Sequence, residues 1–509
     1  MSHTPKCLIF GIDGGTFDII EPLIERGRLP ALAAVMKDSA RARTECTWPP
    51  HTAPGWASFV TAGPPGHHAV YQFFDTQDRE YRARIVGSGD FGCASAWDWL
   101  AAAGWTLGLV NVPMSHPQRK LPGYQITWPL SNTLRYCEPP SLLGELAQAG
   151  AHFQSDLATM YRGESDYIDQ ALQNVDARVR SLAHLLRHHP VDAVMVVLTE
   201  VDRVCHHYWH YSDPSHPAYV EGPSSYATAI ERVYEAVDRA LAKTLALLPD
   251  DCAVVVVSDH GFGPGHDAFA VHRYFEDAGW LATKPSGDSN GAPLGSWFSE
   301  DGREVDWART RLYMPVPGSY GINVNLRSRQ RHGSVAPQDF ESVLDEATVR
   351  LGEVRLPSTG GPAFAKVLRR EEAFAGPWTS KSPDLLLMPA DESLMVQTSL
   401  SGPVWSRSYQ TGLHRFEGMW MHRSPRVHAG RVTERVRLID LMPTLLADLG
   451  VQPAASTPGR VIGSVFGAGA GTASACSIRA QAGPGDVDAD GVELETEALT
   501  TRFKQMGYL

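Results

Sequence analysis

The chain has 509 residues, of which 43% are hydrophobic and 20% are charged, and its formal net charge is −12 at pH 7. This composition is typical of a folded globular protein and excludes extensive disorder. The negative charge and the lack of any dense Lys/Arg run argue against a nucleic-acid polymer or an anionic membrane as partner. Small anionic molecules remain suitable partners where bound metal ions supply local positive charge.

The N-terminal segment and the cysteines predict a cytoplasmic protein. The first twelve residues lack the charged start and long apolar core of a signal peptide, and no apolar run approaches the roughly 20 residues of a membrane span. The seven cysteines form no CxxC pair. We therefore expect neither a disulfide framework nor a cysteine zinc site.

Short apolar runs alternate with helical patterns along the chain. Buried strands are predicted at Cys7–Ile12, Thr106–Asn111, Ala193–Leu198, Ala253–Val257 and Asp384–Met388. Apolar residues at steps of three and four predict a helix over 225–248, and a second helix is expected to open near Pro443 and close at Gly450. The alternation predicts an α/β fold with a mostly parallel sheet, flanked by helices on both faces.

Changes in composition divide the chain into three parts. Residues 1–264 and 411–455 are expected to form the core, and residues 265–410, rich in Gly, Pro and Ser, an inserted cap that includes some core elements. Residues 456–509 are interpreted as a flexible linker and a C-terminal tail. Within the cap, Trp297, Tyr313 and Tyr320 are candidates either for stacking on a flat substrate group or for the cap's own core.

Two of the predicted strands end in side chains that bind metals. Asp13 follows the first strand, and Asp259 and His260 follow the strand 253–257. Ligands of open α/β sheets collect at the carboxyl ends of strands, so these side chains are expected to point into the active crevice. Adjacent Asp and His at a buried strand end are unfavourable unless something binds them. Asp13 alone would equally suit a helix cap.

Three further segments contribute candidate groups. Thr52 lies ahead of a helical pattern, where its hydroxyl suits either an attacking oxygen near a phosphate or a simple N-cap. Asp202 and His206 are four residues apart and would face one metal if the segment is helical. His414, flanked by glycine, would by itself suit a surface loop, but it completes the set.

These groups can be divided between two metal ions. Asp202, His206 and His414 would hold one ion and Asp13, Asp259 and His260 the other, with Thr52 between them. Carboxylate and imidazole ligands without thiolates favour Zn²⁺, with Mn²⁺ or Fe as alternatives.

The order and spacing of these motifs resemble the alkaline phosphatase superfamily, specifically its type I phosphodiesterase and nucleotide pyrophosphatase branch. The resemblance covers nearly the whole chain and rests on five segments: Gly11-Ile-Asp13-Gly, Pro50-His-Thr52-Ala-Pro-Gly-Trp, Asp202-Arg-Val-Cys-His206, Ser258-Asp259-His260-Gly-Phe and Gly412-Leu-His414-Arg. It implies a two-zinc site with the division given above and a covalent phospho-threonine intermediate on Thr52. The expected substrate is a small phosphate ester, with nucleotides among the candidates.

The chain departs from this branch after the nucleophile segment. Relatives commonly have His-Gly followed by Asn or Asp, whereas this chain reads His67-His68-Ala-Val-Tyr-Gln72. The phosphate-binding asparagine has no evident match, which leaves Gln72 and Asn111 as candidates for substrate binding.

A phosphodiesterase or nucleotide pyrophosphatase that acts on a small molecule is the first hypothesis for the function. A phosphomonoesterase, a phosphonate hydrolase or a phosphomutase would use the same two-metal site. A sulfatase is disfavoured because Thr52-Ala-Pro-Gly-Trp replaces its Cys/Ser-x-Pro-x-Arg motif. A protein that has kept the fold but lost catalysis, and that only binds its ligand, is a remote alternative.

Overall fold

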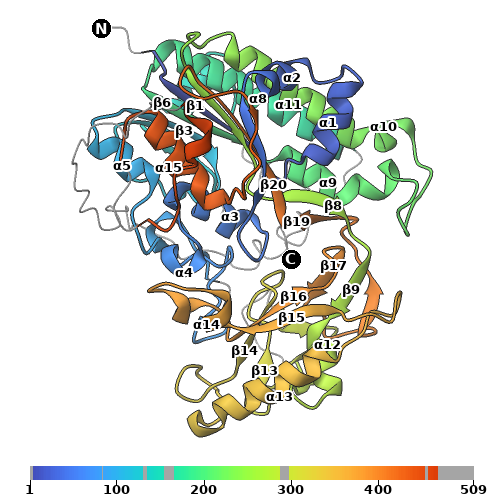
Figure 1. Ribbon diagram of the computed structural model, residues 1–509. Helices are drawn as coiled ribbons and strands as arrows, with labels where there is room; N and C mark the ends of the chain where they lie inside the picture. Colours follow the sequence, from blue (N-terminus) through green and yellow to red (C-terminus); the bar gives the residue numbers. More distant parts are fainter. Residues whose placement is uncertain are drawn as a thin grey trace.

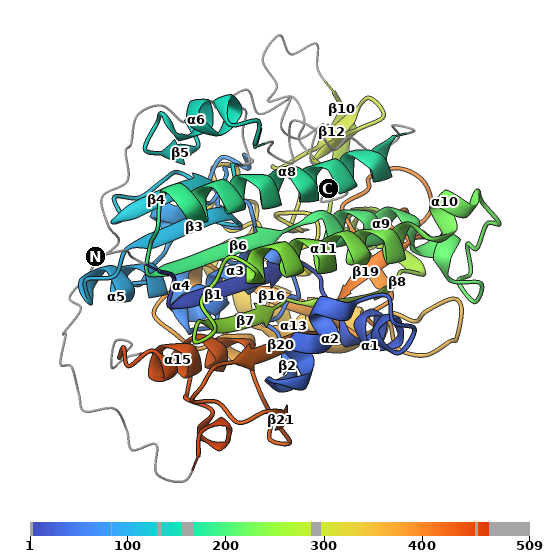
Figure 2. The same ribbon diagram turned by 90° about the horizontal axis from the view of Figure 1, so that it is seen from above.

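The computed structural model describes residues 4–82, 84–129, 135–153, 166–286, 297–452 and 457–467. Its centre is a nine-stranded sheet in the order β21-β2-β20-β7-β1-β6-β3-β4-β5 (Figures 1 and 2). Its strands are β1 (Cys7–Ile12), β2 (Ala40–Glu45), β3 (Leu107–Val112), β4 (Gly123–Thr127), β5 (Cys137–Glu138), β6 (Ala193–Leu198), β7 (Ala253–Val257), β20 (Glu417–Arg423) and β21 (Gly430–Arg431). Strands β7, β1, β6, β3 and β4 run parallel, while β20 and β5 join antiparallel. The predicted mostly parallel α/β fold is confirmed.

The central strands are apolar throughout because both faces of the sheet are covered. Along β1, Cys7 and Ile9 point into one hydrophobic cluster while Leu8 and Phe10 point into the other. The first face is covered by α3 (Thr52–Thr61), α5 (Ala96–Ala102) and α15 (Leu438–Asp448). The second is covered by α1 (Phe17–Glu25), α2 (Pro30–Lys37), α6 (Leu142–Gln148), α8 (Tyr167–His188), α9 (Glu200–Ser212) and α11 (Ala229–Leu245) (Figure 2).

Two predicted helices have different bounds in the structure. The helix expected over 225–248 is divided into α10 (Ser224–Ala227) and α11, because Thr228 leaves helical geometry and its hydroxyl donates to the Ser224 carbonyl. The helix expected to open at Pro443 begins five residues earlier, at Leu438, which places the proline inside α15. Proline removes one helical hydrogen bond, and burial of the apolar side chains around it offsets this loss.

The region predicted as a cap forms the lower lobe in Figure 1 and is built from small sheets. One sheet has the order β13-β14-β16-β15, a second β17-β9-β18 and a third β10-β12-β11. The strands are β9 (Asp267–Ala270), β10 (Thr283–Pro285), β11 (Ser299–Glu300), β12 (Arg303–Val305), β13 (Leu312–Tyr313), β14 (Gly321–Val324), β15 (Phe364–Arg369), β16 (Leu385–Pro389), β17 (Leu394–Gln397) and β18 (Trp405–Arg407). The helices are α12 (Val271–Asp277), α13 (Phe340–Gly352) and α14 (Arg370–Ala373). The strand predicted at Asp384–Met388 is β16, which pairs antiparallel within this lobe.

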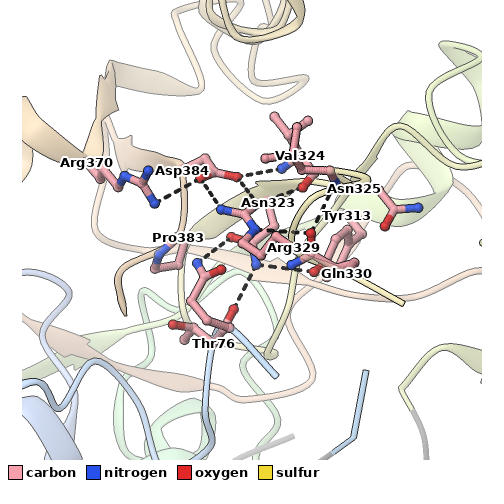
Figure 3. A network of polar contacts seen from close by, with 12 residues as sticks. Thr76, Tyr313, Asn323, Val324, Asn325, Arg329, Gln330, Arg370, Pro383 and Asp384 are labelled. Atoms are coloured by element: carbon pink, nitrogen blue, oxygen red, sulfur yellow. Dashed lines mark hydrogen bonds and ion pairs between the residues drawn. The ribbon is translucent and has the colours of Figure 1, made fainter. Parts of the chain in front are cut away.

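A buried carboxylate accepts hydrogen bonds from several segments of the lobe (Figure 3). Asp384, 1% exposed, accepts hydrogen bonds from Arg329 Nη1 at 2.7 Å and from the backbone N–H of Val324 at 2.8 Å. Beside it, the Asn323 amide donates to the carbonyl oxygen of Thr76 at 2.8 Å. The network therefore joins strands of the lobe and also bonds them to a loop of the core.

The start of the predicted linker packs on the core. Gly459 N–H donates to the Ala62 carbonyl at 2.8 Å, and Ile462 N–H donates to Thr444 Oγ1 at 3.0 Å. The rest of the predicted linker and the tail, residues 468–509, lies outside the described residues. Within the described ranges, no helix combines the length and apolar character that a bilayer crossing requires.

Candidate metal centre and active site

The seven candidate residues, which are spread over 400 positions of sequence, lie together at the carboxyl edge of the central sheet. They come from the ends of the neighbouring strands β1 and β7, the first turn of α3, the first two turns of α9, and a strand, β19 (Gly412–Arg415), that pairs with β8 (Gly261–Pro264). The residues are Asp13, Thr52, Asp202, His206, Asp259, His260 and His414.

The first group joins α9 to β19. His414 Nε2 lies 3.0 Å from Asp202 Oδ1 and 3.0 Å from His206 Nε2, and His206 Nε2 lies 3.4 Å from Asp202 Oδ1. Asp202 and His206 lie one turn apart because this segment is helical, as their spacing required. Three potential ligand atoms therefore converge on one point.

The second group joins the ends of β1 and β7. His260 Nε2 lies 3.3 Å from Asp259 Oδ2 and 3.6 Å from Asp13 Oδ1. The rings of His260 and His414 stack with their centroids 3.7 Å apart, so the two groups are contiguous. Thr52 Oγ1 donates to Asp13 Oδ1 at 3.4 Å and lies 3.5 Å from His260 Nε2.

Backbone carbonyls orient all three histidines. The Nδ1 atoms of His206, His260 and His414 lie 3.0, 3.1 and 2.9 Å from the carbonyl oxygens of Gly412, Gly261 and Pro50. A carbonyl oxygen can only accept, so each Nδ1 carries a proton, and in a neutral ring Nε2 is then the atom with the lone pair. Such acceptors have no side-chain signature, and sequence reasoning did not find them.

The electrostatics of the cluster fit bound cations. Burial, together with nearby Asp13 and Asp202, raises the pKa of Asp259 well above its usual value. Burial opposes the ionisation of Asp202 too, but attraction to the protonated forms of His206 and His414 outweighs it and holds the pKa of Asp202 well below its usual value. Oδ2 of Asp202 and Oδ2 of Asp259 are buried and accept no hydrogen bond from the described residues. Divalent cations would satisfy these oxygens and balance the carboxylates.

The imidazoles are suited to the same role. Burial lowers the pKa of His260 well below its usual value and also lowers that of His414. Both rings are therefore neutral near pH 7, and a neutral imidazole is the form that binds metals. With mixed Asp and His donors and no thiolate, the residues present fit zinc-like divalent ions.

Thr52 occupies the first position of α3, and His51, not Thr52, is the N-cap residue. The Ala53 N–H donates to His51 Nδ1 at 3.2 Å, which leaves the Thr52 hydroxyl available for chemistry. Two more residues of α3 support the site. Trp56 Nε1 donates to Asp13 Oδ2 at 3.1 Å, and Gly55 packs so closely on Asp259 that an added Cβ would lie 2.9 Å from its Cβ.

A cavity of about 300 Å³ opens beside the first group, between the core and the cap. His51, His206 and His414 line its inner side, and Trp297, Tyr320 and other cap residues line its outer side. Glu300 is the one Asp, Glu, Lys or Arg among its described lining residues. The cavity therefore adjoins the candidate metal ligands and has no cationic side chain of its own within the described part of the chain.

Several residues singled out from sequence lie elsewhere. The amide of Gln72 donates to the Pro317 carbonyl at 3.4 Å, and that of Asn111 donates to the Val197 carbonyl at 3.0 Å; neither residue lines the cavity. Tyr313 is buried in the core of the cap, against Trp307 and Tyr81. Of the three cap aromatics, Trp297 and Tyr320 are the two that line the cavity.

Solved structures share this fold. A phosphonoacetate hydrolase from Sinorhizobium meliloti 1021, in complex with phosphonoacetate, is 16% identical, with 86% of this chain and 94% of that chain covered and a TM-score of 0.50. An inactive murine ectonucleotide pyrophosphatase/phosphodiesterase 5 with AMP is 12% identical, with 91% and 100% covered and a TM-score of 0.53. The alkaline phosphatase PafA is 12% identical, with 92% and 100% covered and a TM-score of 0.56. No curated protein sequence matches the chain.

One family model does match by sequence, over residues 7–419, which include every residue of the cluster. The family contains hydrolases of phosphate esters, in keeping with a buried cluster of potential metal ligands next to a helix N-terminus. The chain belongs to the type I phosphodiesterase / nucleotide pyrophosphatase family.

Proposed function

We propose that the protein hydrolyses small-molecule phosphodiesters, with Thr52 as the nucleophile and with two divalent metal ions, of which zinc is the best fit. Asp202, His206 and His414 would hold one ion, and Asp13, Asp259 and His260 the other. When bound, the ions would supply Lewis-acid stabilisation of the phosphoryl oxygens and of the attacking and leaving oxygens.

The roles of the chain's own groups follow from their positions. Thr52 Oγ1 would attack phosphorus, forming one P–O bond while the bond to the leaving group breaks, and the hydroxyl proton would end on the departing oxygen, which leaves as an alcohol. Asp13 Oδ1, which accepts the hydrogen bond of this hydroxyl, is placed to orient it for attack. Water would then cleave the phospho-threonine and restore the hydroxyl. The N-terminus of α3 favours the negative charge of the phosphoryl group throughout.

The lining of the cavity is the observation that favours a diester. A monoester dianion carries one more negative charge than a diester, and enzymes neutralise such charge with Arg or Lys. Arg415, near the site in sequence, donates instead to the carbonyl of Glu392 at 2.7 Å, and Arg407 donates to that of Pro217 at 2.5 Å. Neither lines the cavity, whereas Glu300 does and would repel a dianion.

The test compares bis-p-nitrophenyl phosphate with p-nitrophenyl phosphate for the zinc-loaded protein. We expect a higher kcat/KM for the diester, and a loss of more than about 1,000-fold in Thr52→Ala. Thr61→Ala is the matched control, because Thr61 is buried in the same helix and its hydroxyl bonds to the Ala57 carbonyl. A preference for the monoester would refute the diester assignment, and full activity without Thr52 would refute the nucleophile.

Phosphonate hydrolysis is the second candidate, because the cluster would activate a phosphonate in the same way. The same preparation should therefore be offered phosphonoacetate, with release of inorganic phosphate as the readout. Nucleotide diesters are the first natural substrates to screen, since AMP is bound by a protein of this fold.

A further inference from the structure

A second convergence of metal-binding atoms lies outside the active site. Glu145 projects from α6, His184 from the last turns of α8, and His189 directly follows that helix. His184 Nε2 is 2.6 Å from Glu145 Oε1, and His189 Nε2 is 2.8 Å from the same oxygen and 3.0 Å from Oε2. One carboxylate and two imidazoles thus meet at one point.

The geometry matches that of the active-site groups. All three potential ligand atoms lie within 4.8 Å of one another, as do those of Asp202, His260 and His414 and those of Asp13, Asp259 and His260 in the active site. Two histidines and a glutamate form a ligand set that zinc accepts, with water in the fourth position. The side chains of His184, His189 and Glu145 are 17%, 32% and 39% exposed, which leaves room for that water.

Contacts with neighbouring residues position the imidazole rings of His184 and His189 without a bound ion. The backbone N–H of His189 donates to the Leu185 carbonyl at 2.8 Å, and its ring packs edge-to-face on Tyr124. The ring of His184 lies beside that of His188, with centroids 4.4 Å apart. The last carbonyls of α8 add negative potential at this end of the helix, which favours a cation.

The location separates this cluster from catalysis. α8 ends just before β6 begins at Ala193, so the cluster lies at the amino end of a parallel strand, whereas the active site lies at the carboxyl ends of β1 and β7. A six-residue strand separates these two edges by roughly 20 Å. An ion here would join α6 to α8 and would not contact the substrate.

We propose that Glu145, His184 and His189 form a third metal site, which takes a zinc-like divalent ion and fastens α6 to the end of α8. The competing explanation needs no metal, because two imidazole N–H groups could each donate to the carboxylate. The two explanations differ in the number of ions that the protein binds.

The experiment counts zinc per chain by mass spectrometry, after equilibration in buffered micromolar zinc at pH 7.5 and removal of free ion. Wild type is compared with His184→Ala/His189→Ala and with His332→Ala, an exposed cap histidine. We expect the double variant to hold one ion fewer than wild type and the control, with unchanged hydrolysis of whichever substrate wild type cleaves. Zinc should also raise the thermal midpoint of wild type more than that of the double variant.

Equal zinc content in wild type and the double variant would overturn the proposal. Glu145→Gln serves as a second variant if the double variant folds poorly, since it keeps the side chain's shape and removes its charge. This variant too should hold one zinc ion fewer than wild type. An unchanged zinc content would instead support the explanation in which the two imidazoles donate hydrogen bonds to the carboxylate. The count is read independently of catalysis, so an inactive but folded protein leaves the test valid.

Discussion

Replacing Trp56 by Phe should weaken metal binding without removing a ligand. The indole N–H is fully buried and donates to Asp13 Oδ2 at 3.1 Å, which orients a carboxylate of the proposed second ion site. A hydrogen bond to a charged group contributes about 1.5–3 kcal/mol, and loss of such a supporting contact lowers metal affinity by about 10- to 100-fold. We expect a decrease of that size in zinc affinity, measured by competition with a chromogenic chelator, and a parallel decrease in kcat/KM at limiting zinc.

Trp99→Phe is the matched control for this change. Trp99 is 3% exposed in the same hydrophobic cluster, and its indole nitrogen has no hydrogen-bond partner among the described residues. Both variants lose a similar volume from the core, but only one loses the bond to Asp13. Equal zinc affinity in the two variants would refute the reasoning, since packing alone would then explain any effect.

Three further predictions concern stability. Removing bound metal with a chelator should lower the thermal midpoint, and added zinc at 100 times its Kd should restore about 2.7 kcal/mol; no shift in either direction would contradict a metal centre. Asp384→Ala should cost about 3–5 kcal/mol in urea unfolding by leaving Arg329 unpaired in a partly buried position, whereas Asp345→Ala, whose ion pair is exposed, should cost less than about 1 kcal/mol. Burial lowers the pKa of His68 to about 3 and that of His272 to about 4, so below pH 6.5 the unfolded chain binds protons that the folded protein does not. Stability should therefore fall as the pH drops from 6.5 towards 4, by about 1.4 kcal/mol per unit for each ring, and a His272→Gln variant with an unchanged slope would contradict this.

The central strands could be predicted from sequence because each is a continuous apolar run. β1, β6 and β7 have the predicted bounds, and the candidate metal ligands Asp13, Asp259 and His260 follow at the ends of β1 and β7. Strands buried on both faces carry a strong local signal, and the parallel arrangement brings their carboxyl ends to one edge. This is why residues as distant as Asp13 and Asp259 could be assigned to one cluster from the sequence alone.

The cap could not be predicted in the same detail. Its strands are short and pair with partners far away in sequence, as β17 pairs with β9 over more than 100 positions. Short strands without regular alternation of polar and apolar residues leave little local signal. In the core, the start of α15 is predicted at Pro443 because proline commonly begins a helix, whereas the helix begins at Leu438. The contacts that orient the histidines were also hidden, because their acceptors are backbone carbonyls that any residue at Gly412 or Pro50 would offer.

The base of the cap has a consequence for how specificity changes over evolution. The lobe leaves the core after β8 and returns into β19, and these two strands pair directly, from Gly412 opposite Pro264 to Arg415 opposite Gly261. His216 contacts both ends of the lobe, because its Nε2 lies 2.8 Å from the carbonyl oxygen of Gly265 and 3.0 Å from that of Thr411. The two ends of the lobe are thus held together at one place on the core. Exchanging the lobe between homologues at this stem would replace the outer wall of the cavity while the proposed metal ligands and the proposed nucleophile keep their positions.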